Sequence, residues 1–204
     1  MASRIFNGMS EQPLYGLVLS GGKSRRMGAD KALLEREGQS QLAFVVGLLG
    51  QHVDRVFVST RADQQNEPER ARYDLIIDHY DEMGPLAGIL SAMDDHPDAD
   101  WLVVACDLPN ISDATLTFLL ENRSAAHPFT AYTSSHDGLP EPLCAIYRAD
   151  SATLVRRFAD DGIHCPRKIL IRSDTHLLEQ VDPASLDNVN TPDDLAQSVL
   201  GAGS

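Results

Sequence analysis

Cysteine, long apolar runs and positive charge are all scarce in this 204-residue sequence. The three cysteines, Cys106, Cys144 and Cys165, are scattered and form no Cys-x-x-Cys pair, which argues against a disulfide framework and a structural zinc site. The longest apolar run, residues 42–49, is too short to span a bilayer, and no secretory signal is visible. We therefore expect a cytoplasmic protein with reduced thiols.

Seventeen Lys and Arg stand against 30 Asp and Glu, which gives a net charge of -13. A surface of this sign does not suit a nucleic-acid backbone or an anionic membrane, so neither is an expected partner. The 43% hydrophobic and 23% charged content is near the average of globular proteins. The length suits one domain, expected over residues 14–200 after a flexible lead-in of residues 1–13.

Short apolar runs alternate with helically spaced apolar residues through the first half of the chain. Strands are expected at residues 14–20, 55–59, 75–78 and 101–107, with helices after Ser40, after Gly84 and Pro85, and after Ser112. This alternation predicts an α/β fold with a mainly parallel sheet covered by helices on both faces.

The second half is less regular, but its elements can still be placed. We expect strands at 129–132 and 143–147 around a turn-rich stretch at 134–142, a helix at 152–158, a strand at 177–181 and a last helix capped by Thr191.

A basic, glycine-rich loop follows the first expected strand at residues 19–31. Four of the 17 cationic residues fall between Lys23 and Lys31, where even spreading would place fewer than one. Glycines let backbone N–H groups approach phosphate oxygens, and ligands of open parallel sheets gather at the carboxyl ends of strands. The loop indicates a polyanion site; the alternative is an ordinary glycine-rich turn with solvated cations.

Two familiar nucleotide fingerprints fail on spacing. Gly22-Lys23-Ser24 resembles the end of a Walker A motif, but the glycine required five places before Gly22 is Leu17. The sequence also contains no Gly-x-Gly-x-x-Gly motif. A P-loop NTPase is therefore a weak candidate.

Asp107 follows the apolar run that precedes Leu108-Pro109. A carboxylate at a strand end beside a phosphate-binding loop is well placed to hold Mg²⁺, which prefers a few hard oxygens together with phosphates and water. Asp78 ends the preceding expected strand in the same way and is a weaker candidate. Simple capping of a turn is the alternative for both.

Four motifs in this order resemble the MobA-like molybdenum cofactor guanylyltransferases, within the wider nucleotidyltransferase superfamily. They are the loop at 19–31, Gly84-Pro85-Leu86-Ala87-Gly88, Cys106-Asp107-Leu108-Pro109 and Asn188-Val189-Asn190-Thr191-Pro192. The resemblance implies a Rossmann-like three-layer sandwich with a mainly parallel, mixed sheet, as in nucleotide-diphospho-sugar transferases. It also implies transfer of GMP from GTP to the phosphate of molybdenum-bearing molybdopterin. It also implies transient contact with proteins that supply molybdopterin or receive the product.

The resemblance also implies functional roles for individual residues of this chain at the matching positions. The implied nucleotide-binding residues are Leu19, Ser20, Gly21, Gly22, Lys31, Ser59, Asp78 and Asp107. Lys31 and Arg25 would supply catalytic positive charge, Asp107 would hold Mg²⁺, and Asn190 would be a second metal ligand or a buried structural amide. Ser20 stands where the family usually has Ala, and Ser59 where it has Asn near the base.

The acceptor site is harder to place. Arg167 and Lys168 form a cationic pair in an acidic stretch and would grip the molybdopterin phosphate, unless they form only a solvated basic turn. No catalytic base is needed, because the attacking phosphate is already ionised at neutral pH. The departure at Ser59 keeps CMP transfer from CTP open, and a GTP-binding accessory protein without turnover is a third possibility.

Overall fold

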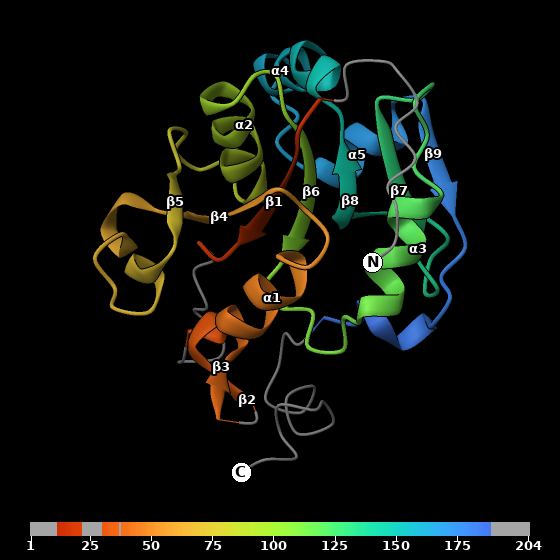
Figure 1. Cartoon of the computed structure of the whole chain (residues 1–204). Helices are drawn as coiled ribbons and strands as arrows, with labels where there is room; N and C mark the ends of the chain where they lie inside the picture. The colour runs from red at the N-terminus through yellow and green to blue at the C-terminus, as the bar shows by residue number, and fades with distance from the viewer. Residues whose placement is uncertain (1–11, 22–29, 37, 189–204) are drawn as a thin grey trace.

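The computed structural model describes residues 12–21, 30–36 and 38–188, and within them seven strands form one sheet (Figure 1). From edge to edge the strands are β5 (Asp74–Ile77), β4 (Arg55–Thr60), β1 (Leu14–Leu19), β6 (Asp100–Ala105), β8 (Pro140–Tyr147), β7 (Phe129–Thr133) and β9 (Thr175–Leu178). β8 runs antiparallel to both of its neighbours, and the other paired strands of this sheet are parallel. The expected mainly parallel, mixed sheet is confirmed.

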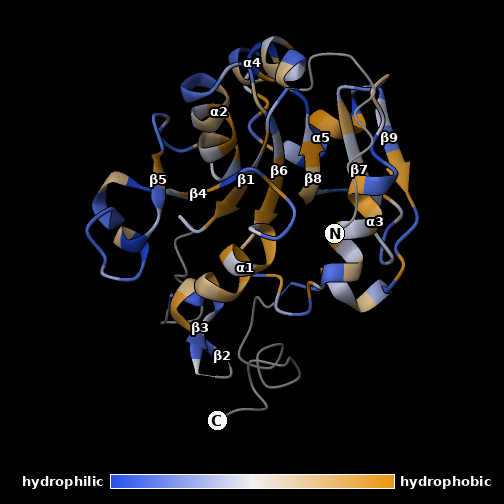
Figure 2. Cartoon of the chain, in the orientation of Figure 1, coloured by the Kyte–Doolittle hydropathy of each residue, from blue (hydrophilic) through white to orange (hydrophobic). Residues whose placement is uncertain are grey.

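Helices cover both faces of this sheet. One face carries α1 (Gln41–Leu49) and α3 (Asp113–Glu121), and the other carries α2 (Pro85–Asp95), α4 (Ala152–Asp160) and α5 (Pro166–Ile171). Side chains alternate along each strand, so that Leu17 packs into one core and Val18 into the other. Figure 2 shows the resulting apolar strands at the centre of the three layers. None of the helices that the structure describes is long and apolar enough to cross a membrane.

The helices of the first half begin where the sequence predicts. The Ser40 hydroxyl accepts from the backbone N–H of Ala43 at 3.0 Å and caps α1. Ser112 caps α3 in the same way. Gly84 adopts a φ of 57° before α2, and Pro85 follows it in the first turn, where its missing N–H costs nothing. A small hairpin of β2 (Glu35–Arg36) and β3 (Gln39–Ser40) precedes α1 outside the main sheet.

Three expected strand boundaries are wrong. The strand expected to reach Asp107 ends at Ala105, because the chain turns before Pro109, which has no N–H to donate. β8 begins at Pro140 instead of residue 143, because β7 pairs with Pro140 and Glu141, whereas β6 pairs only with Cys144–Tyr147. The strand expected at 177–181 is β9, shifted toward the N-terminus.

One helix was not expected. Residues 166–171, where a solvated basic turn is one of the two alternatives that the sequence leaves open, form α5, with Pro166 in its first turn and Ile169 and Leu170 buried against the sheet. The helix expected after Thr191 and most of the lead-in expected at residues 1–13 lie outside the described residues. The single domain expected over residues 14–200 therefore stays a prediction.

Candidate active site

A cavity of about 1140 Å³ lies at the carboxyl ends of the parallel strands. β1, β4, β5 and β6 run side by side, and the turns that follow them meet at this edge. The described residues expected to bind nucleotide all line this one cavity: Leu19, Ser20, Gly21, Lys31, Ser59, Asp78 and Asp107. Three expected site residues, Gly22, Arg25 and Asn190, lie outside the described residues.

Lys31 and Asp107 join the loop after β1 to the turn after β6. Asp30 caps the short 3-10 helix at residues 31–33 by accepting from the backbone N–H of Ala32 at 3.1 Å. This cap directs Lys31 across the cavity, where its Nζ lies 3.4 Å from Asp107 Oδ2. The two side chains are 18% and 29% exposed, so this ion pair is largely shielded from water.

The surroundings of Asp107 indicate whether the site fits a metal ion. Its Oδ1 is buried and finds no hydrogen-bond partner within the described ranges. A buried carboxylate oxygen left unpaired costs free energy, and a cation would satisfy it. The described residues contain no group of three or more His, Cys, Asp and Glu suited to hold a metal. Asp107 therefore fits a divalent ion that takes most of its ligands from phosphate and water, as is usual for Mg²⁺.

Asp78 and Ser59 form the opposite wall of the cavity. The Ser59 hydroxyl donates to Asp78 Oδ1 at 2.8 Å. Burial raises the pKa of Asp78, and this effect outweighs the hydrogen bond from Ser59 and the positive charge of Arg61, which both lower it. Arg61 in turn donates to the backbone carbonyl of Gly21 at 2.5 Å. Ser59 thus orients Asp78 here, at the position where the resemblance leads us to expect Asn.

Arg70, like Arg61, belongs to the site although the sequence does not predict it. It is completely buried beneath the cavity, and Nη2 donates to the Ser20 carbonyl at 2.9 Å and to Asp30 Oδ2 at 2.8 Å. Nε donates to the Ser20 hydroxyl at 3.1 Å, and Glu67 completes the set through an ion pair with Nη1. The sequence offers no signal for this contact, because Arg70 is one of three arginines in an otherwise polar connection.

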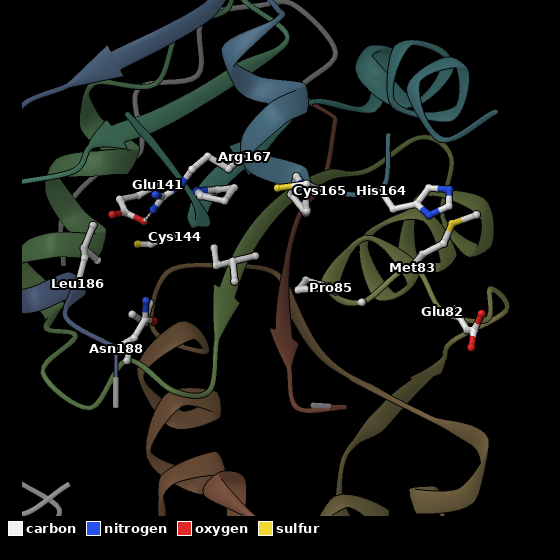
Figure 3. A pocket seen from close by; sticks show the side chains of 15 residues that line it. Glu82, Met83, Pro85, Glu141, Cys144, His164, Cys165, Arg167, Leu186 and Asn188 are labelled. Carbon is white, nitrogen blue, oxygen red and sulfur yellow. Dashed lines mark hydrogen bonds and ion pairs between the residues drawn. The ribbon is translucent and has the colours of Figure 1, made fainter. Parts of the chain in front are cut away.

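A second cavity of about 530 Å³ adjoins the first. Glu82, Gly84, Pro85 and Leu143 line both. Most of the wall is apolar, and Figure 3 shows Arg167 and Glu141 pointing toward one another at its edge. Arg167 Nη2 lies 2.8 Å from Glu141 and Nη1 lies 2.9 Å from Asp137.

The side chains of the expected cationic pair, Arg167 and Lys168, point in different directions. Arg167 lines the second cavity, whereas Lys168 is exposed and is not among the described residues that line it. Both belong to α5, where consecutive side chains point about 100° apart. The structure therefore does not bring Arg167 and Lys168 together at the second cavity, and their binding of an acceptor phosphate stays a prediction.

Comparison with known proteins gives a consistent result. The family model described as a MobA-like NTP transferase domain matches residues 16–177. A molybdenum cofactor biosynthesis bifunctional protein from Synechocystis is 36% identical over 93% of this chain, which spans 54% of that protein's length. A probable molybdenum cofactor guanylyltransferase from Mycobacterium ulcerans is 34% identical, with 91% of this chain and 93% of the relative covered.

A solved structure agrees with the fold. The crystal structure of molybdopterin-guanine dinucleotide biosynthesis protein A from Archaeoglobus fulgidus superposes with a TM-score of 0.74 at 26% identity. The match covers 90% of this chain and 95% of that one. The sheet and its helices therefore share their arrangement over nearly the whole of both molecules.

Proposed function

This chain belongs to the MobA-like NTP transferase family, and we propose that it transfers GMP from GTP to the phosphate of molybdopterin bearing molybdenum, with release of pyrophosphate. The observation that carries the proposal is the meeting of Leu19, Gly21, Lys31 and Asp107 in one cavity at the carboxyl edge of the sheet. Cytoplasmic location and transient contact with molybdopterin-supplying or receiving proteins remain part of the same proposal.

The nucleotide phosphates would bind between the loop after β1 and Lys31. Backbone groups at Leu19, Ser20 and Gly21 border the cavity, and a Cβ at Gly21 would lie 3.3 Å from Asp78 Oδ2, so a larger residue would narrow the site. Lys31 offsets the negative charge that grows on the departing pyrophosphate. Arg25 is proposed for the same role from the sequence.

Mg²⁺ is proposed as the cofactor, held by Asp107 through its unpaired Oδ1. When bound there, the ion would supply positive charge to the phosphates at the reacting centre. Lys31 and Asp107 would then share one task, since Lys31 pairs with the other carboxylate oxygen, Oδ2, and leaves Oδ1 to the ion. Asn190 remains a proposed second ligand from the sequence alone.

The chemistry requires positioning more than proton transfer. The acceptor phosphate is ionised at neutral pH, so it can attack the α-phosphorus of GTP without a catalytic base. The protein must bring two anions into line against their repulsion and stabilise the charge of the transition state.

The second cavity is the proposed acceptor site. Its apolar wall, including Pro142 and Leu143, suits the flat face of a pterin, and Arg167 offers a cation at its edge. Because Arg167 is already paired with Asp137 and Glu141, its charge is partly compensated. We therefore propose that Arg167 orients the acceptor through directional hydrogen bonds more than through net charge.

Asp78 favours GTP over CTP as the donor. Guanine presents two N–H donors side by side on its Watson–Crick edge, and a carboxylate accepts both, whereas cytosine presents a donor beside an acceptor. Ser59 fixes Asp78 Oδ1 by its 2.8 Å hydrogen bond.

One experiment tests the proposal against its alternatives. Purified protein, Mg²⁺ and molybdopterin are incubated separately with GTP and CTP, and pyrophosphate and the dinucleotide product are measured. Product with GTP is the expected result. Product with CTP alone would assign CMP transfer, and GTP binding without pyrophosphate would assign an accessory protein.

A further inference from the structure

Arg70 is a buried charge that the chemistry proposed above does not use. Its side chain is 0% exposed, in the connection between β4 and β5. An ion without water must be compensated by the protein, and Arg70 is compensated by groups from two distant segments and from its own turn. Glu67 accepts from its backbone N–H at 3.1 Å as well as from its guanidinium, which holds Arg70 in place.

The distant partners are the two ends of the loop that follows β1. Ser20 lies on one side of this loop and Asp30 on the other, and a single guanidinium hydrogen-bonds to both. Ser20 precedes Gly21, and Asp30 precedes Lys31, so each contact lies one residue from a group that lines the nucleotide cavity. Asp30 also caps the turn that carries Lys31.

We infer that Arg70 is a positioning residue for nucleotide transfer, which clasps Ser20 and Asp30 so that Gly21 and Lys31 meet the nucleotide from fixed places. This inference rests on the proposed function, because Gly21 and Lys31 are assigned to the nucleotide there. Binding groups that are already held in place, here Gly21 and Lys31, lose less conformational entropy when the ligand binds. The planar fork of Arg allows one side chain to reach both ends, and the single ammonium of Lys does not.

The clasp also gives Ser20 a role at the position where the family usually has Ala. Its hydroxyl accepts from Arg70 Nε and donates to the carbonyl of Ser59 at 2.9 Å. An alanine there would leave Arg70 Nε buried without this acceptor. Ser20 and Arg70 should therefore act as a coupled pair.

The test compares Arg70→Lys and Ser20→Ala with the matched control Arg72→Lys. Arg72 follows two residues later, pairs with Glu69 and is 66% exposed. Steady-state kcat and KM are measured for GTP and for molybdopterin, and GTP affinity is measured by calorimetry, well below each unfolding temperature. We expect Arg70→Lys to lower kcat/KM for GTP by about 100-fold, as misplaced binding groups commonly do.

Ser20→Ala should raise the KM for GTP about fivefold to tenfold, in line with loss of a hydrogen bond to a charged group. The same change should have a much smaller effect in the Arg70→Lys background, and Arg72→Lys should match the wild type. A purely structural role would lower the folded fraction and with it kcat, while leaving the KM for GTP unchanged.

The outcomes separate the two proposals. If the wild type neither binds nor turns over GTP, the proposed function fails and takes the clasp with it. If the wild type is active and Ser20→Ala keeps a normal KM for GTP, or acts equally in both backgrounds, the clasp alone is overturned. If Arg70→Lys does not fold, the KM of Ser20→Ala for GTP still tests the clasp.

Discussion

Gly88→Ala should destabilise the protein although it adds a better helix former to α2. A Cβ at Gly88 would lie 2.1 Å from Ser59 Oγ and 2.9 Å from both Ser59 Cβ and Leu19 Cδ2. Rotating the Ser59 hydroxyl relieves only the first contact, because the Cβ is fixed to the strand. Overpacking of this kind costs about 1–3 kcal/mol, against a helix-propensity gain of about 1 kcal/mol for Ala over Gly.

We expect a net loss of up to about 2 kcal/mol in the free energy of unfolding, which lowers the Tm by up to roughly 8 °C for a chain of this size. Gly47→Ala is the matched control, since it makes the same change in α1 with nothing within 4 Å of the new Cβ. That variant should gain about 0.5–1 kcal/mol. Both are measured by urea denaturation and by circular dichroism on heating.

Gly88→Ala should also weaken GTP binding, because a displaced Ser59 no longer holds Asp78. Calorimetric titration with GTP measures this effect, and Gly47→Ala should bind GTP normally. The steric reasoning is refuted if the two variants are equally stable, and the link to the site is refuted if both bind GTP as the wild type does.

Three further predictions concern the cavity walls. Lys31→Ala and Asp107→Ala should each lower turnover by about 100-fold or more with the fold intact by circular dichroism, and near-normal rates in both would remove them from the mechanism. Asp78→Asn should weaken GTP binding yet unfold at higher urea than the wild type at pH 7. Burial raises the pKa of Asp78 in the folded state, so the ionised carboxylate costs the folded protein stability that Asn does not; the gap should close as pH falls toward about 4, and a pH-independent gap would contradict this cause. Arg167→Ala should raise the KM for molybdopterin and leave that for GTP unchanged, whereas Lys168→Ala should change neither.

Local signals were sufficient for most of the fold. Ser40, Ser112 and the Gly84–Pro85 pair mark helix starts because capping chemistry depends on neighbouring residues alone. The start of β8 depends instead on how far β7 extends beside it, which no local pattern reports. Pro166 was an available signal for α5, but the basic residues after it suggested a turn.

The site residues that follow strands could also be predicted from the sequence, whereas those that depend on distant contacts could not. Residues at strand ends meet when the sheet is parallel, so Asp78 and Asp107 could be placed together from sequence order. Arg70 could not, because the burial of a charge depends on partners 40 and 50 positions away in the chain. The division of Arg167 from Lys168 followed only once these residues were known to be helical.

The wall that the two cavities share has a consequence for product release. Pro85 and Leu143 border both cavities, so the dinucleotide product would occupy both at once. Its nucleotide half and its pterin half would then hold each other in place. Tethered halves rebind faster than separate molecules, so the dinucleotide would dissociate more slowly than either substrate. Product release, more than bond formation, would then limit the rate. A downstream protein that binds the dinucleotide and removes it would raise the turnover rate.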